Sequence, residues 1–171
     1  MLTPEQEKWI GHLSDTDLIT IVPFDVTAEE KFFCVKQKIQ NVIGNGYAIE
    51  HHGATSLRIS GQDEIDVYVP VSPEKFDELV EALKVHFGEP RSLYPLRRAR
   101  FITIEDDKHI DIFAINEQGD DYKNMLIFET YLKTHPESLE EYRKLKEAGD
   151  GQSVREYYRR KFIFLNQIIY E

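Results

Sequence analysis

Apolar residues at helical spacing, preceded by capping residues and followed by glycine or proline, predict six helices along this chain. The expected ranges are 1–18, 27–43, 72–87, 122–134, 138–148 and 153–170, and the first helix could instead end at Leu13. Gly44 and Gly88 stand where the second and third of these should end. Glycine is common just after a helix because it adopts the left-handed backbone that terminates the last turn.

Short runs of alternating polar and apolar residues predict strands between these helices. The expected strands are 47–51, 64–69, 100–105 and 109–115, with residues 19–22 also extended. Asp106, Asp107 and Lys108 form a link short enough for a hairpin between the last two strands. Pro70 is expected to close the strand that begins at Glu64.

The order of these elements predicts an α/β or α+β fold in which helices flank a mixed sheet. With 171 residues, the chain is long enough for one domain with a substantial core. Within that single domain, we expect an N-terminal helix (1–18), an α/β core (19–118) and a helical C-terminal segment (119–171).

Acidic residues in the middle of the predicted strands are the first candidates for chemistry. Alternate residues of a strand share a face, so Glu64 and Asp66 should point the same way, as should His109 and Asp111. Carboxylates on rigid neighbouring strands are the ligands with which phosphoryl-transfer sites hold Mg²⁺. The alternative is that these acids are solvated on an exposed sheet face.

A glycine-led turn follows the first predicted core strand. Gly53 is succeeded by Ala54, Thr55 and Ser56, small residues whose backbone N–H groups can be approached closely. Such turns are typical of anion pockets, so this segment is a candidate phosphate-binding site.

Two further groups have open interpretations. Arg97, Arg98 and Arg100 could receive substrate phosphates, because a guanidinium matches phosphate oxygens in a forked geometry, or they could offset nearby acids. His51 and His52 should point to opposite faces, whereas His109 could join Asp111 as a metal ligand or acid/base group. Hydrogen-bonded structural histidines are the alternative.

Charge and composition limit the kinds of partner that we expect this protein to bind. A net charge of −10 argues against general nucleic-acid binding. Basic residues are interleaved with aromatic ones in 154–170, but the apolar positions recur at helical spacing, which favours packing over nucleic-acid contact. A single cysteine, the lack of a signal-peptide pattern and the lack of a long apolar run predict a cytoplasmic protein without a membrane segment.

The chain resembles the GrpB family of small bacterial proteins, which is placed in the nucleotidyltransferase superfamily. The resemblance rests on three motifs and covers nearly the whole chain from Ile19. The motifs are IVPFD (21–25), IEHHGATSLRISGQDEIDVYVPV (49–71) and LIFETYLKTHPESLEEYRKLK (126–146).

The resemblance implies a nucleotidyltransferase-like sheet, a turn that contacts nucleotide phosphates and metal-binding acids on adjacent strands. By position, Gly53, Thr55 and Ser56 fall in the turn, and Asp66 and Asp111 are strand acids. Ala54 stands where serine is usual. Two alignments of the acidic motif remain open: either Glu64 and Asp66 form the usual pair, or Tyr68 replaces its second acid.

The function expected from these observations is Mg²⁺- or Mn²⁺-dependent transfer of a nucleotidyl group from an NTP to a small acceptor. Asp66, Asp111 and Glu64 are the expected catalytic and metal-binding acids, with His109 as a further metal ligand. The expected nucleotide contacts are Gly53, Ala54, Thr55, Ser56, Arg98 and Arg100. The alternative is a catalytically inactive protein of the same fold that binds a nucleotide or a partner.

Overall fold

A computed structural model describes residues 1–170, whose contacts divide the chain into two compact units. The sheet unit comprises residues 25–58 and 63–125. The helical unit comprises residues 1–24, 59–62 and the chain from 126 onward. Helix α5 (Asp120–Thr134) begins in the sheet unit and continues into the helical unit.

The sheet has five strands in the order β1-β2-β5-β4-β3. In chain order they are β1 (Glu50–His52), β2 (Glu64–Val71), β3 (Ser92–Tyr94), β4 (Arg98–Glu105) and β5 (Lys108–Asn116). The two long strands β2 and β5 are parallel neighbours, and the other three pairs are antiparallel. This mixed sheet with flanking helices confirms the predicted fold class.

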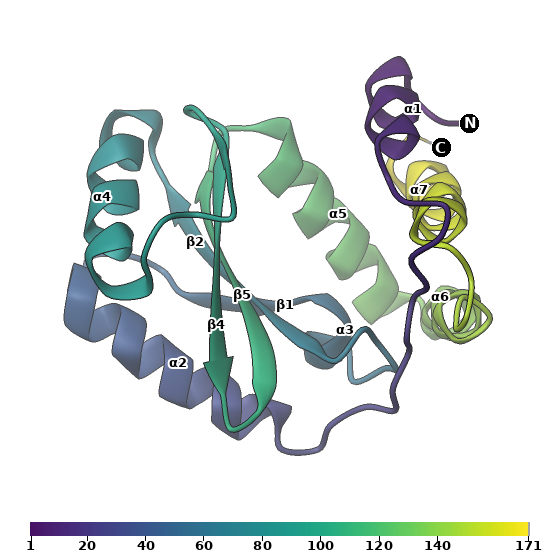
Figure 1. The fold of residues 1–171 in the computed structure, drawn as a ribbon, viewed down its shortest axis with the longest axis horizontal. Helices are drawn as coiled ribbons and strands as arrows, with labels where there is room; N and C mark the ends of the chain where they lie inside the picture. The colour runs from purple at the N-terminus through teal and green to yellow at the C-terminus, as the bar shows by residue number, and fades with distance from the viewer. Residues whose placement is uncertain (171) are drawn as a thin grey trace. The chain divides into compact units, whose positions relative to one another are not determined.

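Helices α2 (Ala28–Ile43) and α4 (Phe76–Phe87) cover one face of the sheet (Figure 1). That face carries the apolar residues of the alternating strands, and Ile65, Val67, Ile110 and Ile112 are fully buried there. The short 3₁₀ helix η1 (Pro73–Lys75) leads into α4. Gly44 and Gly88 end the two helices with φ near +75°, as expected for glycine terminators.

The helical unit contains α1 (Pro4–Gly11), α6 (Pro136–Glu147) and α7 (Val154–Tyr170), together with most of α5. Trp9 on α1 makes edge-on ring contacts with Tyr158 and Phe162 on α7, at 5.3 and 5.5 Å between centroids. These contacts agree with the packing role predicted for the aromatic residues of the last helix. Among residues 1–170, no helix is both long and apolar enough to cross a bilayer.

The predicted hairpin joins β4 to β5 through two residues. Glu105 pairs with Lys108, and the intervening Asp106 and Asp107 have φ values of 46° and 62°. Positive φ at both central residues is the requirement of a type I′ turn, whose twist matches that of the flanking strands. The hairpin prediction is therefore confirmed.

The N-terminal segment differs from the prediction. Helix α1 ends at Gly11, two residues before the earlier predicted end at Leu13. It does not continue to Leu18, because the Ser14 hydroxyl accepts the backbone N–H groups of Thr16 and Asp17 and fixes a turn instead. Residues 19–22 do not form a strand. The structure has only isolated bridges there, from Leu18 to Ser153 and from Val22 to Gly61.

The observed strand boundaries also differ from those predicted from the sequence. Strand β2 continues through Pro70 to Val71, and Pro70 is still paired with Ile115 of β5. Proline is tolerated there because Pro70 lies beyond the residues that pair with β1, where that side of β2 is an edge. Strand β1 begins at Glu50 rather than Tyr47. The three-residue β3 was not predicted, since it is too short to show an alternating pattern.

Candidate functional site

The polar face of the sheet collects the predicted acids in two adjacent rows. Parallel pairing of β2 and β5 sets Glu64 opposite His109 and Asp66 opposite Asp111. Because partners in a ladder share a face and neighbouring strands lie about 4.8 Å apart, both pairs project from the same side of the sheet. On the edge strand β1, His52 lies opposite Asp66 and extends the second row.

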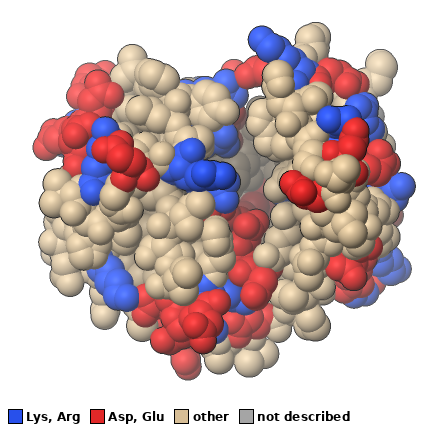
Figure 2. Space-filling model, viewed as in Figure 1, with Lys and Arg blue, Asp and Glu red and all other residues tan. Residues whose placement is uncertain are grey.

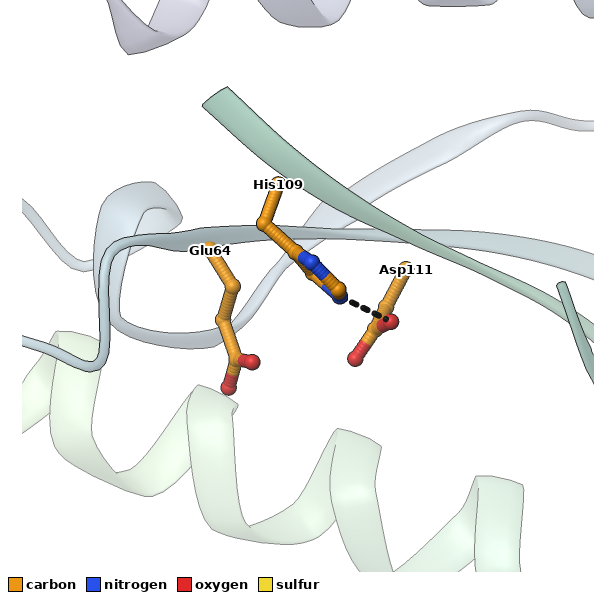
Figure 3. Close-up of side chains that lie close together, drawn as sticks. All are labelled: Glu64, His109 and Asp111. Carbon is orange, nitrogen blue, oxygen red and sulfur yellow. Dashed lines mark hydrogen bonds and ion pairs between the residues drawn. The ribbon is translucent and has the colours of Figure 1, made fainter. Parts of the chain in front are cut away.

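Three of these side chains form a compact group on the polar face. One possible ligand atom from each of Glu64, His109 and Asp111 lies within 4.8 Å of the other two. Figure 3 shows the three side chains extending in the same general direction, with a hydrogen bond between His109 and Asp111. We refer to Glu64, His109 and Asp111 as the acidic cluster.

Asp111 is the buried member of the acidic cluster, with 3% of its surface exposed. Its Oδ1 accepts a hydrogen bond of 3.0 Å from His109 Nε2. Its Oδ2 lies 2.8 Å from Nη2 of Arg100, which comes from β4. A buried carboxylate is costly without such partners, so this arrangement stabilises a negative charge in the sheet.

Asp66 lies against the glycine-led turn. Gly53 begins the one-turn helix α3 (Gly53–Ser56) with φ of +77°, directly after β1. A Cβ atom added to Gly53 would lie 2.1 Å from Oδ2 of Asp66 and 3.0 Å from its Cγ. The structure thus brings the Gly53 backbone and the Asp66 carboxylate into close approach.

The other residues of the turn have different surroundings. Thr55 is buried, and its hydroxyl shares a 2.9 Å hydrogen bond with Nε2 of His51. The His51 ring in turn stacks on Phe32 of α2, at 4.7 Å between centroids. Thr55 therefore anchors the turn to the core, while Ala54 and Ser56 are partly exposed.

Arg97, Arg98 and Arg100 make different contacts. Arg97 is paired with Asp121, with 2.7 Å between its Nε and Oδ2 of the acid. The guanidinium carbon of Arg98 lies 5.4 Å from the ring centroid of Tyr94 and 5.8 Å from that of Phe113. The buried Nε of Arg98 has no hydrogen-bond partner among residues 1–170. Arg100 is bonded to Asp111 of the acidic cluster.

Tyr68 is part of an aromatic row on the polar face of the sheet. Its ring lies 4.8 Å from that of Phe113 and 4.9 Å from that of His52. Glu64, by contrast, belongs to the acidic cluster. Glu64, Asp66 and Tyr68 alternate along β2 and therefore share its polar face.

His52 has the hydrogen-bonded surroundings of a structural histidine. It is buried, and its Nε2 donates to Glu50 at 2.9 Å. Glu50 also accepts from the hydroxyl of Tyr122, again at 2.9 Å. Burial and this bond to the Glu50 carboxylate raise the pKa of Tyr122 far above its ordinary value, so its hydroxyl stays protonated as a donor.

One charged network was missed by the sequence analysis. Lys108 is only 5% exposed, and its ammonium pairs with Asp63 and, at 3.2 Å, with Asp25. Asp25 also pairs with Lys31 at 2.9 Å. Lys108 and Asp63 immediately precede His109 and Glu64, which are partners in the sheet. The only sequence signal was the position of Asp25 at the end of the IVPFD motif.

A hydrogen bond is the largest influence on the pKa of Asp25. The Thr27 hydroxyl donates to Oδ1 of Asp25 at 2.6 Å, and Lys31 and Lys108 add charge-assisted contacts. These interactions hold the pKa of Asp25 well below its ordinary value of 3.8, against the opposing effect of burial. Asp25 is thus ionised and binds Lys108 at the start of β5. Lys108 in turn pairs with Asp63, which directly precedes β2.

The donor set of the polar face fits a small hard cation. Carboxylate oxygens are the preferred ligands of Mg²⁺, and Mn²⁺ accepts carboxylate together with imidazole. Glu64, Asp111 and His109 would hold such an ion, with Asp66 beside them in the next row. Across the face drawn in Figure 2, acidic patches are interspersed with basic side chains.

Comparisons with known proteins agree with this architecture. The profile of the GrpB protein family matches residues 18–171. A UPF0157 protein of Vibrio cholerae is 25% identical over 124 residues, which cover 71% of this chain and 65% of that protein. The chain thus spans about two thirds of the length of this relative.

A solved structure shows the same fold. The crystal structure of the conserved protein GrpB from Enterococcus faecalis superposes with a TM-score of 0.67. The match covers 86% of this chain and 93% of that one, at 21% identity. Since the family profile matches nearly all of the sequence, the chain belongs to the GrpB family.

Proposed function

We propose that this protein transfers a nucleotidyl group from an NTP to a small acceptor in a reaction that depends on Mg²⁺ or Mn²⁺. The observation that carries the proposal is the pairing of β2 with β5. It sets Asp66 opposite Asp111 and Glu64 opposite His109, beside the Gly53 turn. Three carboxylates near a glycine-led turn are the groups that this chemistry requires.

Each part of the site has a distinct role in the proposed reaction. Glu64, Asp111 and His109, whose ligand atoms lie together, would hold the metal. Asp66, opposite Asp111 in the ladder, would be the third acid. Bound metal would neutralise the charge of the phosphates and orient the α-phosphorus for attack by an acceptor oxygen, with pyrophosphate as the leaving group. The backbone of the Gly53 turn, with Arg98 and Arg100 of β4, would bind the phosphate oxygens.

A nucleotide-binding protein without catalysis is the second candidate. It is favoured by Ala54, which stands in the turn where the family usually has serine and so removes one hydroxyl from the phosphate region. In that case the metal–nucleotide complex would bind but would not be turned over.

Thermal denaturation tests the nucleotide site directly. The melting temperature should rise when Mg²⁺ or Mn²⁺ is added together with an NTP, because a ligand that binds the folded state stabilises it. Asp66→Asn should abolish this rise. Asp77→Asn is the matched control, since Asp77 is an exposed acid on α4, which covers the opposite face of the sheet.

Turnover separates the two candidates. Release of pyrophosphate from an NTP in the presence of candidate acceptors supports the transferase, whereas a shift of melting temperature without turnover supports the binding protein. No shift with any metal–nucleotide mixture would contradict both, and a shift that survives Asp66→Asn would place the nucleotide elsewhere.

A further inference from the structure

Asp111 has both carboxylate oxygens occupied by neighbouring side chains. His109 Nε2 donates to Oδ1, and Arg100 Nη2 lies 2.8 Å from Oδ2. The side chain of Asp111 is 5% exposed. Because the carboxylate is enclosed by these partners, a metal ion that coordinates Asp111 competes with them for the space and the lone pairs around it.

The ion pair between Arg100 and Asp111 also reduces the negative charge of the site that would bind a cation. Without it, Glu64, Asp66 and Asp111 would present three carboxylates on one face. With it, the guanidinium neutralises one of them at hydrogen-bond distance. Because charges in contact interact strongly where water is partly excluded, this pairing should weaken the binding of a divalent cation.

Arg100 is suited to exchange its partner. Its side chain is 34% exposed, unlike the enclosed Asp111, so part of it can be approached from solvent. A guanidinium forms forked hydrogen bonds with phosphate as readily as with carboxylate. Arg98 lies two residues away on the same face of β4, and its buried Nε has no partner among residues 1–170. A phosphate between these two arginines would therefore compete with Asp111 for Arg100.

We propose that Arg100 couples the phosphate and metal sites: it holds Asp111 when no phosphate is bound and releases it to the metal when it binds substrate phosphate. This inference rests on the proposed function, since it assigns an order of events to the same site. Free cation binds weakly, and a tetrahedral anion at Arg100 strengthens cation binding. By linkage, the cation strengthens anion binding by the same factor.

The test measures the dissociation constant of Mn²⁺ alone by calorimetry in the wild type and in Arg100→Met. We expect Arg100→Met to bind Mn²⁺ about fivefold more tightly or better, within the usual range of coupling between sites. Arg97→Met is the matched control, because it removes the same charge from the residue just before β4, where Arg97 pairs with Asp121. Its Mn²⁺ affinity should change by less than about twofold, since charges at a distance are screened.

A second arm adds sulfate, a tetrahedral anion that complexes Mn²⁺ weakly in water, against chloride at equal ionic strength. Sulfate should tighten Mn²⁺ binding to the wild type but not to Arg100→Met. If Arg100→Met does not fold, Arg100→Gln is compared with Arg97→Gln, because each removes the charge and keeps a polar side chain. Arg100→Gln should then bind Mn²⁺ more tightly than Arg97→Gln.

Equal Mn²⁺ affinities in the Arg100 and Arg97 variants, or a sulfate effect that survives in Arg100→Met, would overturn the inference. Absence of Mn²⁺ binding in every protein would overturn both it and the proposed function. Coupling without turnover of any NTP supports the inference and removes the transferase. Turnover without coupling supports the transferase and removes the inference.

Discussion

The carboxylate of Asp66 occupies the space that a side chain on Gly53 would need. An added Cβ would lie 2.1 Å from Oδ2 of Asp66, and Gly53 has φ of +77°. Two independent constraints therefore favour glycine at this position: the left-handed backbone and the close approach of an acid from the neighbouring strand. The turn and the metal-binding candidates are parts of one packed arrangement.

Gly53→Ala should weaken both the fold and the metal site. A non-glycine residue in the left-handed region costs about 1–2 kcal/mol, and displacement of Asp66 should lower Mn²⁺ affinity by about tenfold. Urea unfolding and Mn²⁺ titration measure the two effects separately. Gly46→Ala is the control, because no atom lies within 4 Å of its added Cβ and its φ is not positive. Equal effects of the two substitutions would show that the contact with Asp66 is unimportant.

The alternation of polar and apolar residues was sufficient to predict which acids share a face of each strand. Alternation along residues 64–69 and 109–115 placed the acids on common faces, because strand periodicity is local. The hairpin at Asp106 and Asp107 was equally local. What alternation does not contain is register, so the opposition of Asp66 and Asp111 became visible only with the parallel pairing of two strands separated by α4, β3 and β4.

Long-range ion pairs were beyond the sequence for the same reason. Arg100 was identified as a phosphate ligand or a surface charge, and its contact with Asp111 follows from the antiparallel pairing of β4 with β5. The burial of Lys108 was not predicted either, because lysine is rarely enclosed and nothing nearby in sequence reveals Asp25 as its partner. Charge pairing of this kind depends on tertiary structure.

Acid should destabilise the protein partly through Asp25. Its pKa in the folded state is depressed below 3.8, so its contribution to stability is complete above that value and is lost as the pH falls below it. The free energy of unfolding should therefore fall between about pH 5 and about pH 2.5 by more in the wild type than in Asp25→Asn. Asp77→Asn should behave as the wild type. A loss with acid that is the same in all three proteins would contradict this role of Asp25.

Lys108→Met should leave two carboxylates without their shared cation. Breaking a buried ion pair typically costs 3–5 kcal/mol, and we expect about 3 kcal/mol because the Asp63 side chain is 55% exposed and can be hydrated. Urea unfolding measures this cost, with Lys75→Met, an exposed lysine before α4, as the control. Since Lys108 and Asp63 precede His109 and Glu64, Mn²⁺ affinity should also fall. A neutral effect would show that Met packing compensates for the lost charges.

The β4–β5 turn offers a test in which two substitutions at one residue act in opposite directions. Asp107 has φ of 62°, a conformation that glycine adopts freely and alanine does not. Asp107→Gly should raise the free energy of unfolding by about 0.5 kcal/mol, because the second central position of a type I′ turn prefers glycine. Asp107→Ala should lower it by about 1 kcal/mol, since alanine lacks the side-chain oxygen that makes Asp tolerable there. Both substitutions remove the same charge, so a shift of both variants in one direction would mean that electrostatics, rather than turn geometry, controls this hairpin.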